Sequence, residues 1–182
     1  MAVLKVVKYG DPILRKKCSE VTHFDTISKV VDDMFDTMYE EEGIGLAANQ
    51  VGFDMNLMII DVTHTDESNE AQVFINGEIT GSWGESVLDE GCLSIPEIRL
   101  DVKRPEFVRF KYRTMEGDEK EEEFSGLLAR AIQHEYDHLN GILVIDHVSS
   151  MIRLQLKKQL KEIEKETYTN LKNEKFKNSY VL

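Results

Sequence analysis

Residues 26–42 repeat apolar side chains every three or four positions, which is the spacing of an amphipathic helix. The apolar positions are Ile27, Val30, Val31, Met34 and Met38. Asp25 or Thr26 can cap the start of this helix, and Gly43 can end it. The sequence therefore predicts a helix that buries one face.

Several other segments predict strands. The short apolar run "AVLKVV" near the N-terminus predicts a first strand, and "LMIIDV" at 57–62 predicts a buried one. Residues 72–80 predict a strand that is weakened at Gly77. Residues 106–114 alternate apolar and charged side chains, which is typical of a strand with one buried face. The acidic stretch 115–123 then predicts a hairpin turn and a solvated arm.

The C-terminal part is predicted to be helical. Ser125 is a good N-cap for a helix that runs to about Asn140, with Gly141 just past its end. A last helix is predicted from about 149 or 150 to 174, and residues 175–182 are expected to fray. Strands come first and helices later, so the predicted fold class is α+β. With no repeat or linker, we expect residues 1–182 to form one catalytic domain, with 151–182 as its C-terminal helix and tail.

The composition is that of a globular domain, with 41% hydrophobic and 31% charged residues. No apolar run approaches the ~20 residues that span a membrane. The N-terminus is broken at 10–12 by Gly, Asp and Pro, so it lacks the apolar segment of a secretory signal. We therefore expect a cytoplasmic protein in which Cys18 and Cys92 are reduced thiols, and the alternative is a disulfide between them.

Charge is unevenly spread along the chain. The net charge is −12, but residues 151–182 carry +4, so the remaining 150 residues carry −16. An acidic body argues against general nucleic-acid binding and predicts no specific DNA partner. The basic C-terminal segment could still approach a polyanion, and the alternative is a solvated helix with ion pairs between successive turns.

The segment "AIQHEYDHLNG" at 131–141 contains His134, Glu135 and His138 on or beside the buried stripe of the predicted helix. Two histidines four residues apart on a helix can hold a divalent metal, and the Glu between them can serve as a base. The alternative is a pair of surface histidines beside an ion-pairing Glu. A catalytic site of this kind usually needs a third protein ligand.

The downstream part of the chain offers few third ligands. Metalloproteases of the metzincin type continue with Gly and a third His, but this chain has Asn140 and Val144 at those positions. Another class of peptidase uses a Glu from a later helix, for which Glu162 and Glu164 are the candidates. Both lie in a charged repeat of ordinary surface character.

Upstream, "EGCLSIP" at 90–96 offers Cys92. A thiolate and two imidazoles form a suitable ligand set for catalytic zinc or ferrous iron. Spacing alone does not show that Cys92 reaches His134, and an isolated cysteine is more often a small buried residue.

Three segments together resemble the motifs of the peptide deformylases in order and approximate spacing. They are "GIGLAANQ" at 43–50, "EGCLS" at 90–94 and "QHEYDH" at 133–138. The likeness extends over most of the chain and is closest to the bacterial form that ends in a helix. It implies mostly antiparallel sheets packed around a central helix that carries the HExxH motif. Asn49 and Gly77 depart from residues common in the family, and we expect neither to touch the chemistry.

The resemblance implies a metal-dependent hydrolase that removes the N-formyl group from the formylmethionine of newly made polypeptides and releases formate. It assigns Cys92, His134 and His138 as metal ligands. In the family the physiological metal is Fe²⁺, with Zn²⁺, Ni²⁺ or Co²⁺ as substitutes, and this ligand set permits all of them.

The resemblance also assigns the proton transfer to Glu135. The side chain of Gln50 and the backbone N–H of Leu93 match the groups that stabilise the developing oxyanion, and one such donor is typically worth ~3 kcal/mol. Ile44 and Gly91 would pair with the peptide backbone in strand fashion.

An apolar pocket should hold the methionine side chain of the substrate. The resemblance implies that it is formed by Ile44, Leu88, Leu127 and Ala131, with Gly45 allowing close approach of the backbone. Arg130 lies next to this lining and is expected to turn its head outward. Glu90 and Arg104 are expected to pair and to hold the "GCLS" segment. Because deformylation acts on chains that leave a ribosome, the basic C-terminal helix is expected to dock there.

Overall fold

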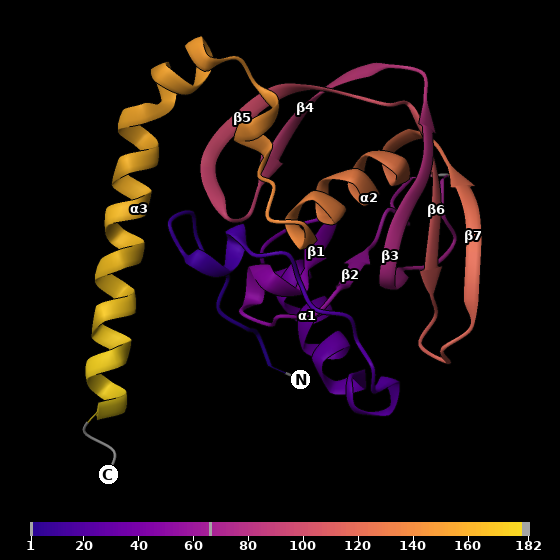
Figure 1. Ribbon diagram of the computed structural model, residues 1–182, viewed down its shortest axis with the longest axis horizontal. Helices are drawn as coiled ribbons and strands as arrows, with labels where there is room; N and C mark the ends of the chain where they lie inside the picture. Colours follow the sequence, from indigo (N-terminus) through magenta and orange to yellow (C-terminus); the bar gives the residue numbers. More distant parts are fainter. Residues whose placement is uncertain (1, 66, 180–182) are drawn as a thin grey trace.

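The computed structural model describes residues 2–65 and 67–179 and contains two sheets and three α-helices (Figure 1). The α-helices are α1 (Ser28–Glu40), α2 (Gly126–Leu139) and α3 (Ser150–Ser179). The strands are β1 (Gly45–Ala47), β2 (Leu57–Ile60), β3 (Gln72–Trp83), β4 (Ser86–Cys92), β5 (Ile95–Arg104), β6 (Phe107–Arg113) and β7 (Glu119–Phe124). Short 3₁₀ turns are η1 (Pro12–Arg15), η2 (Phe24–Thr26), η3 (Ala48–Val51) and η4 (Val144–His147). All strand pairs are antiparallel, so the predicted α+β class is confirmed.

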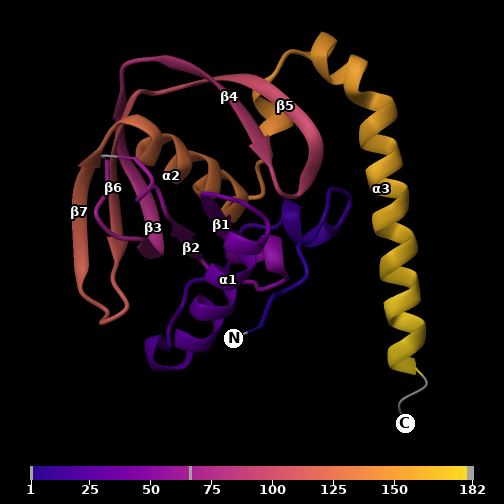
Figure 2. The same cartoon turned by 180° about the vertical axis from the view of Figure 1, so that it is seen from behind.

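Helix α2 lies between the two sheets. Five strands form one sheet in the order β1-β2-β3-β6-β7, and β4 and β5 form a separate hairpin. Figures 1 and 2 show this hairpin arching over α2 on the side opposite β1 and β2. The helix that carries the two histidines is therefore covered on both sides, as its buried stripe predicts.

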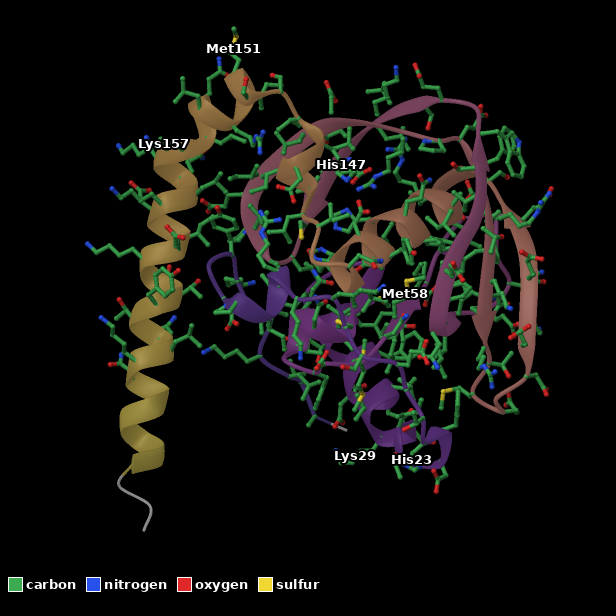
Figure 3. All side chains as sticks on the ribbon, viewed as in Figure 1. His23, Lys29, Met58, His147, Met151 and Lys157 are labelled. Carbon is green, nitrogen blue, oxygen red and sulfur yellow. The ribbon has the colours of Figure 1, made fainter. Side chains whose placement is uncertain are left out.

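Strand β2 is apolar throughout because both of its faces are covered. Met58 and Ile60 pack with the residues of α2, and Leu57 and Ile59 pack with those of α1. A strand buried on both faces has a continuous apolar run and no alternation. Figure 3 shows Met58 near the centre of the molecule, whereas Met151 projects from the tip of α3, where it is 71% exposed.

The predicted weak point in β3 is confirmed. The register between β3 and β6 shifts between Ile75 and Glu78, where Asn76 has a positive φ of 52°. A Cβ on Gly77 would come within 2.2 Å of Cζ of Phe110, so the strand passes too close to that ring for any larger residue. In this chain, the ring of Phe110 therefore requires a residue without a Cβ at Gly77.

The predicted N-terminal strand is wrong. Residues 2–8 adopt no regular secondary structure, and their backbone donors bind scattered acceptors. Leu4 N donates to Oγ1 of Thr37 on α1, and Val7 N donates to the carbonyl of Gln50 in η3. The apolar run is half-buried against several elements and pairs with no neighbouring strand.

The β4–β5 hairpin has no counterpart among the predicted strands. Four of the seven residues of β4 are polar or glycine, and only Glu90 of this strand is buried, so the apolar signal of a strand is missing. In β5 the burial does alternate, with Val102 and Leu100 facing inward. The missed hairpin is the element that carries Cys92.

The two C-terminal helices follow the predicted bounds closely. Helix α2 begins after Ser125, but its N-terminus is bound by a residue from another loop, because the carboxylate of Glu67 accepts from Leu128 N at 2.9 Å. Gly141 has φ of 75°, as expected just past the helix end. Helix α3 continues to Ser179, five residues beyond its predicted end, and residues 180–182 of the segment expected to fray lie outside the described residues. Among the described residues, no helix combines the length and apolar character needed to cross a bilayer.

Candidate metal centre

Three potential metal ligands come together from two elements. Cys92 ends β4, and His134 and His138 occupy successive turns of α2. Their donor atoms all lie within 4.8 Å of one another, and Sγ of Cys92 is 3.2 Å from Nε2 of His138. This is the one such cluster of three in the described part of the chain, so the upstream candidate for the third ligand is the residue that meets the histidines.

A buried carboxylate orients the first histidine. Nδ1 of His134 lies 3.0 Å from Oε2 of Glu90, so the hydrogen bond leaves Nε2 of the ring directed to the cluster. Metal-ligating histidines commonly hold a carboxylate through their other ring nitrogen, which sets the tautomer and ring orientation. The geometry of His134 is of this kind.

Glu90 is in turn held by two buried arginines. Arg104 donates from Nε and Nη2 to its two oxygens at 2.7 and 3.0 Å, and Arg130 donates from Nη1 at 2.9 Å. Burial would raise the pKa of Glu90, but hydrogen bonds from His134 and Arg104 hold the pKa well below its ordinary range. The expected Glu90–Arg104 pair is therefore present, and it supports His134 as well as the Cys92 segment.

The cluster favours a thiolate at Cys92. Burial alone would raise the pKa of this thiol, but the adjacent His138 and His134 rings hold it well below its ordinary value. A thiolate is the form of cysteine that binds metal. Cys18 contrasts with it, because burial raises the pKa of that thiol to about 11. Both cysteines are free, so the alternative of a Cys18–Cys92 disulfide is wrong.

Glu135 points into the site without a hydrogen bond. Its side chain is 5% exposed, and its buried Oε2 has no partner among the described residues. Burial raises the pKa of this carboxyl, against the opposing effect of His134 and His138. Gly45 lies directly against it: a Cβ there would be 2.7 Å from Oε1. A buried, unpartnered carboxylate beside three metal donors is available for proton transfer.

Gln50 is fixed so that its amide donors face the cluster. Its Oε1 accepts from Ala47 N at 2.9 Å, and its Nε2 lies 3.2 Å from Oγ of Ser94 and 3.8 Å from Sγ of Cys92. Leu93 lines the same space, and its carbonyl accepts from Nζ of Lys8. Both predicted oxyanion donors are thus next to the three ligands.

A cavity of about 600 Å³ opens beside the cluster. All six residues that were predicted to contact the substrate line it, namely Ile44, Gly45, Leu88, Gly91, Leu127 and Ala131. It lies between β1 and the preceding loop, the β4–β5 hairpin and α2. The structure therefore brings together the predicted substrate-contacting residues with Gln50, Cys92, His134 and Glu135 in one concave site.

Two expectations about neighbouring residues are wrong. Arg130 does not turn its head outward; it is 5% exposed and donates to Glu90. Asn49 was expected not to touch the chemistry, but its Nδ2 donates to the backbone carbonyl of His138 at 2.6 Å. No pattern in the sequence distinguishes a buried arginine or amide from a solvated one, because both depend on partners that are distant in the chain.

The alternative third ligands lie elsewhere. Glu164 packs against Gly10 and lines a separate cleft between α3 and the 3₁₀ turns. Glu162 is an exposed residue of the same helix. Within the described residues, neither belongs to a cluster of metal-binding side chains, so the peptidase alternative has no site here.

The donor set fits a divalent metal ion. It combines one thiolate, two imidazoles and a nearby unpartnered carboxylate, which is a three-ligand set that leaves a coordination position open. His138 also keeps Nδ1 buried without a partner in the described part of the chain, while Nε2 faces Cys92.

Comparisons with known proteins agree with this site. A family model described as polypeptide deformylase matches residues 3–153. A peptide deformylase of Zymomonas mobilis is 46% identical over 169 residues, which cover 89% of this chain and 96% of the relative. One from Mesorhizobium japonicum is 44% identical and covers 91% and 96%.

Solved structures are similar over the same length. The crystal structure of a peptide deformylase from Legionella pneumophila has a TM-score of 0.82 and 38% identity, with 92% of this chain and 98% of that chain covered. The structure from Thermus thermophilus has a TM-score of 0.85 and 34% identity, with 91% and 99% covered.

Proposed function

Because this chain belongs to the polypeptide deformylase family and removes the N-formyl group from nascent polypeptides, we propose that Cys92, His134 and His138 hold its metal ion. The observation that carries this proposal is the convergence of their donor atoms within 4.8 Å beside a cavity. When bound, a divalent ion in this ligand set polarises the formyl carbonyl and lowers the pKa of water. We propose Fe²⁺ as the native metal, with Zn²⁺, Ni²⁺ or Co²⁺ as substitutes.

Glu135 is proposed to move the proton. Its carboxylate has no competing hydrogen bond among the described residues, and the absence of a Cβ on Gly45 leaves the space that it occupies. It accepts a proton from the attacking water and delivers it to the leaving amine of the methionine. This converts the formyl amide to formate and a free N-terminus.

Gln50 and Leu93 are proposed to stabilise the oxygen of the formyl group as it gains negative charge. The contact between Oε1 of Gln50 and Ala47 N fixes which end of the amide is a donor. The Leu93 backbone N–H supplies a second donor beside Cys92. Donors that are held in place before reaction need no reorganisation in the transition state.

The peptide is proposed to bind as an added strand. Within the part of the chain that the structure describes, β1 pairs with β2 on one side only, and β4 pairs only with β5. The open edges at Ile44 and Gly91 both face the cavity, so a substrate backbone can pair there in extended form. The methionine side chain then enters the space between Leu88, Leu127 and Ala131.

Cys92→Ala tests the ligand set. We expect the variant to lose bound metal and to release no formate from formyl-Met-Ala-Ser. Metal content is measured by elemental analysis of anaerobically prepared protein, which also identifies the native metal. A Cys92→Ala variant with full metal and full activity would contradict the proposal.

We propose in addition that the protein is cytoplasmic and that α3 docks on the ribosome. Residues 151–182 carry +4, and Arg153, Lys157 and Lys161 recur every four residues along α3 and line its cleft. Cations at this spacing share one helix face and can neutralise phosphates. A variant in which Arg153, Lys157 and Lys161 are all changed to Gln is expected to co-sediment less with ribosomes at low salt. Equal co-sedimentation would remove these three residues from this role.

A further inference from the structure

Arg130 binds both strands of the β4–β5 hairpin from within α2. Its Nη2 donates to the carbonyl and Oγ of Ser86 at 3.0 and 2.6 Å, and its Nη1 donates to Oε1 of Glu90 and the carbonyl of Val102, both at 2.9 Å. One guanidinium therefore ties the first residue of β4, a residue near the end of β4 and a residue near the end of β5 to the central helix.

These contacts surround one residue of the cavity wall. Ser86, Leu88 and Glu90 lie on the same face of β4, because alternate residues of a strand share a face. Val102 is the cross-strand partner of Leu88. Arg130 thus donates hydrogen bonds to Ser86 and Glu90, which lie two positions before and after Leu88, and to Val102, which lies opposite Leu88.

Leu88 itself has little else to fix its position. It is 43% exposed and lies on a two-stranded hairpin that has no third strand. Such a hairpin is marginally stable unless it packs on another element. Because Leu127 and Ala131 of α2 form the opposite wall, the distance between hairpin and helix sets the width of the pocket.

We propose that Arg130 is a positioning residue that sets the width of the side-chain pocket and thereby the selectivity for the first residue of the substrate. The proposal rests on the proposed binding of the methionine side chain between Leu88, Leu127 and Ala131. Arg130 itself lines the cavity, but all four hydrogen bonds of its guanidinium go to the hairpin, so it acts on the pocket through Leu88. A guanidinium is suited to this because its donors diverge in a plane, whereas a lysine offers a single charged point.

The role of Arg130 is tested by measuring the preference between two substrates on the same protein sample. We compare kcat/KM for formyl-Met-Ala-Ser and formyl-Phe-Ala-Ser, because their ratio does not depend on the fraction of active or metal-loaded protein. Arg130→Met keeps an apolar stem but removes all four hydrogen bonds. We expect the preference for methionine to fall about tenfold, the range by which pocket fit discriminates apolar side chains. KM for the methionine substrate should rise more than kcat falls.

Two milder variants keep the test decisive if Arg130→Met does not fold. Arg130→Lys retains the charge but only part of the bonding, and Ser86→Ala removes one hydrogen bond without burying an unpaired charge. Both should lower the preference for methionine, by less than Arg130→Met. The matched control is Lys103→Met, which removes an exposed cation of β5 that pairs with Glu85 and makes no link to α2; its ratio should equal that of the wild type.

The possible results separate this inference from the proposed function. A wild-type protein that releases no formate from formyl-Met-Ala-Ser contradicts the proposed function. A folded Arg130→Lys or Ser86→Ala protein that deformylates both substrates with the wild-type ratio overturns the role of Arg130. If Arg130 only stabilised the fold, its substitution would lower both rates equally. The ratio would then be unchanged, and the positioning role would be overturned.

Discussion

Two arginine–glutamate ion pairs of this protein differ sharply in exposure to solvent. Arg104 and Glu90 are 4% and 6% exposed beneath the β4–β5 hairpin, whereas Arg109 and Glu123 are 48% and 57% exposed on β6 and β7. The exposed pair is solvated and screened by salt, so it contributes little to stability. The buried pair must offset the desolvation of both groups through several hydrogen bonds.

The difference shows what the buried charges do. A buried ion pair is weak evidence for stability, because apolar residues of similar volume often serve as well. Glu90, however, accepts from Arg104, Arg130 and His134 at once, and His134 belongs to the metal cluster. We infer that this network orients the metal ligand His134, whereas the ion pairs between β6 and β7 keep the edge strand β7 charged.

The largest effect is expected from Glu90→Gln. It leaves Arg130 without its anion and Arg104 with Asp137 alone, and breaking a buried pair in this way costs about 3–5 kcal/mol. The free energy of unfolding in urea measures it. A loss below about 1 kcal/mol would mean that the network relaxes easily, and the comparison of buried and exposed pairs would fail.

The same substitution should also weaken metal binding. Glutamine can still accept from Nδ1 of His134 but carries no charge, and changes in such supporting groups typically lower metal affinity about 10–100-fold. Competition with a chelator measures the affinity in the folded fraction. An unchanged affinity would show that α2 alone orients His134.

The ion pair between Arg15 and Asp146 is intermediate in exposure, and its contribution to stability should depend on pH. Burial opposes its ionisation, but the hydrogen bond from Arg15 and that from Leu143 N hold the pKa of this carboxyl below 3.8. A lowered pKa in the folded state means that the contribution to stability is present above about pH 4 and is lost as pH falls through the folded pKa. Because Arg15 is 43% exposed, the contribution should stay below about 1 kcal/mol.

Asp146→Asn tests this sign. The variant should be slightly less stable than the wild type at pH 7, and the two stabilities should converge as the pH falls below 4. Urea unfolding at a series of pH values measures the difference. A difference that grows toward acid pH would contradict the assignment.

The smallest effect is expected from Glu123→Gln on the exposed side. The variant removes the ion pair with Arg109, and we expect the unfolding midpoint to be unchanged within error. It is the matched control for Glu90→Gln, because both substitutions neutralise a glutamate that pairs with an arginine. A large destabilisation here would remove the contrast between the two regions.

The same contrast explains what the sequence could predict. Helices α1 and α2 and strand β6 follow from apolar periodicity, and strands β2 and β3 follow from their runs of apolar residues. The β4–β5 hairpin carries few buried residues on β4 and was not predicted. Its place over α2 depends on Arg104, Arg130 and Glu90, which are polar residues whose burial arises only when distant segments meet.

The site was predictable to the extent that its motifs resemble a family. Spacing on α2 was enough to pair His134 with His138, but the approach of Cys92 needed either the resemblance or the structure. Arg130 and Asn49 were misjudged because their partners lie 28 to 89 residues away in the chain. Glu67 was missed for the same reason, since it binds the N-terminus of α2 from a loop 61 residues earlier.

The most direct test of the account is the Glu135→Gln variant, with bound metal and formate release measured on the same sample. Glutamine keeps the volume beside Gly45 but cannot accept the proton. The account predicts that the variant binds metal as the wild type does and releases formate from formyl-Met-Ala-Ser about 10²–10⁴-fold more slowly. A fully metal-loaded variant that turns over at the wild-type rate would contradict it.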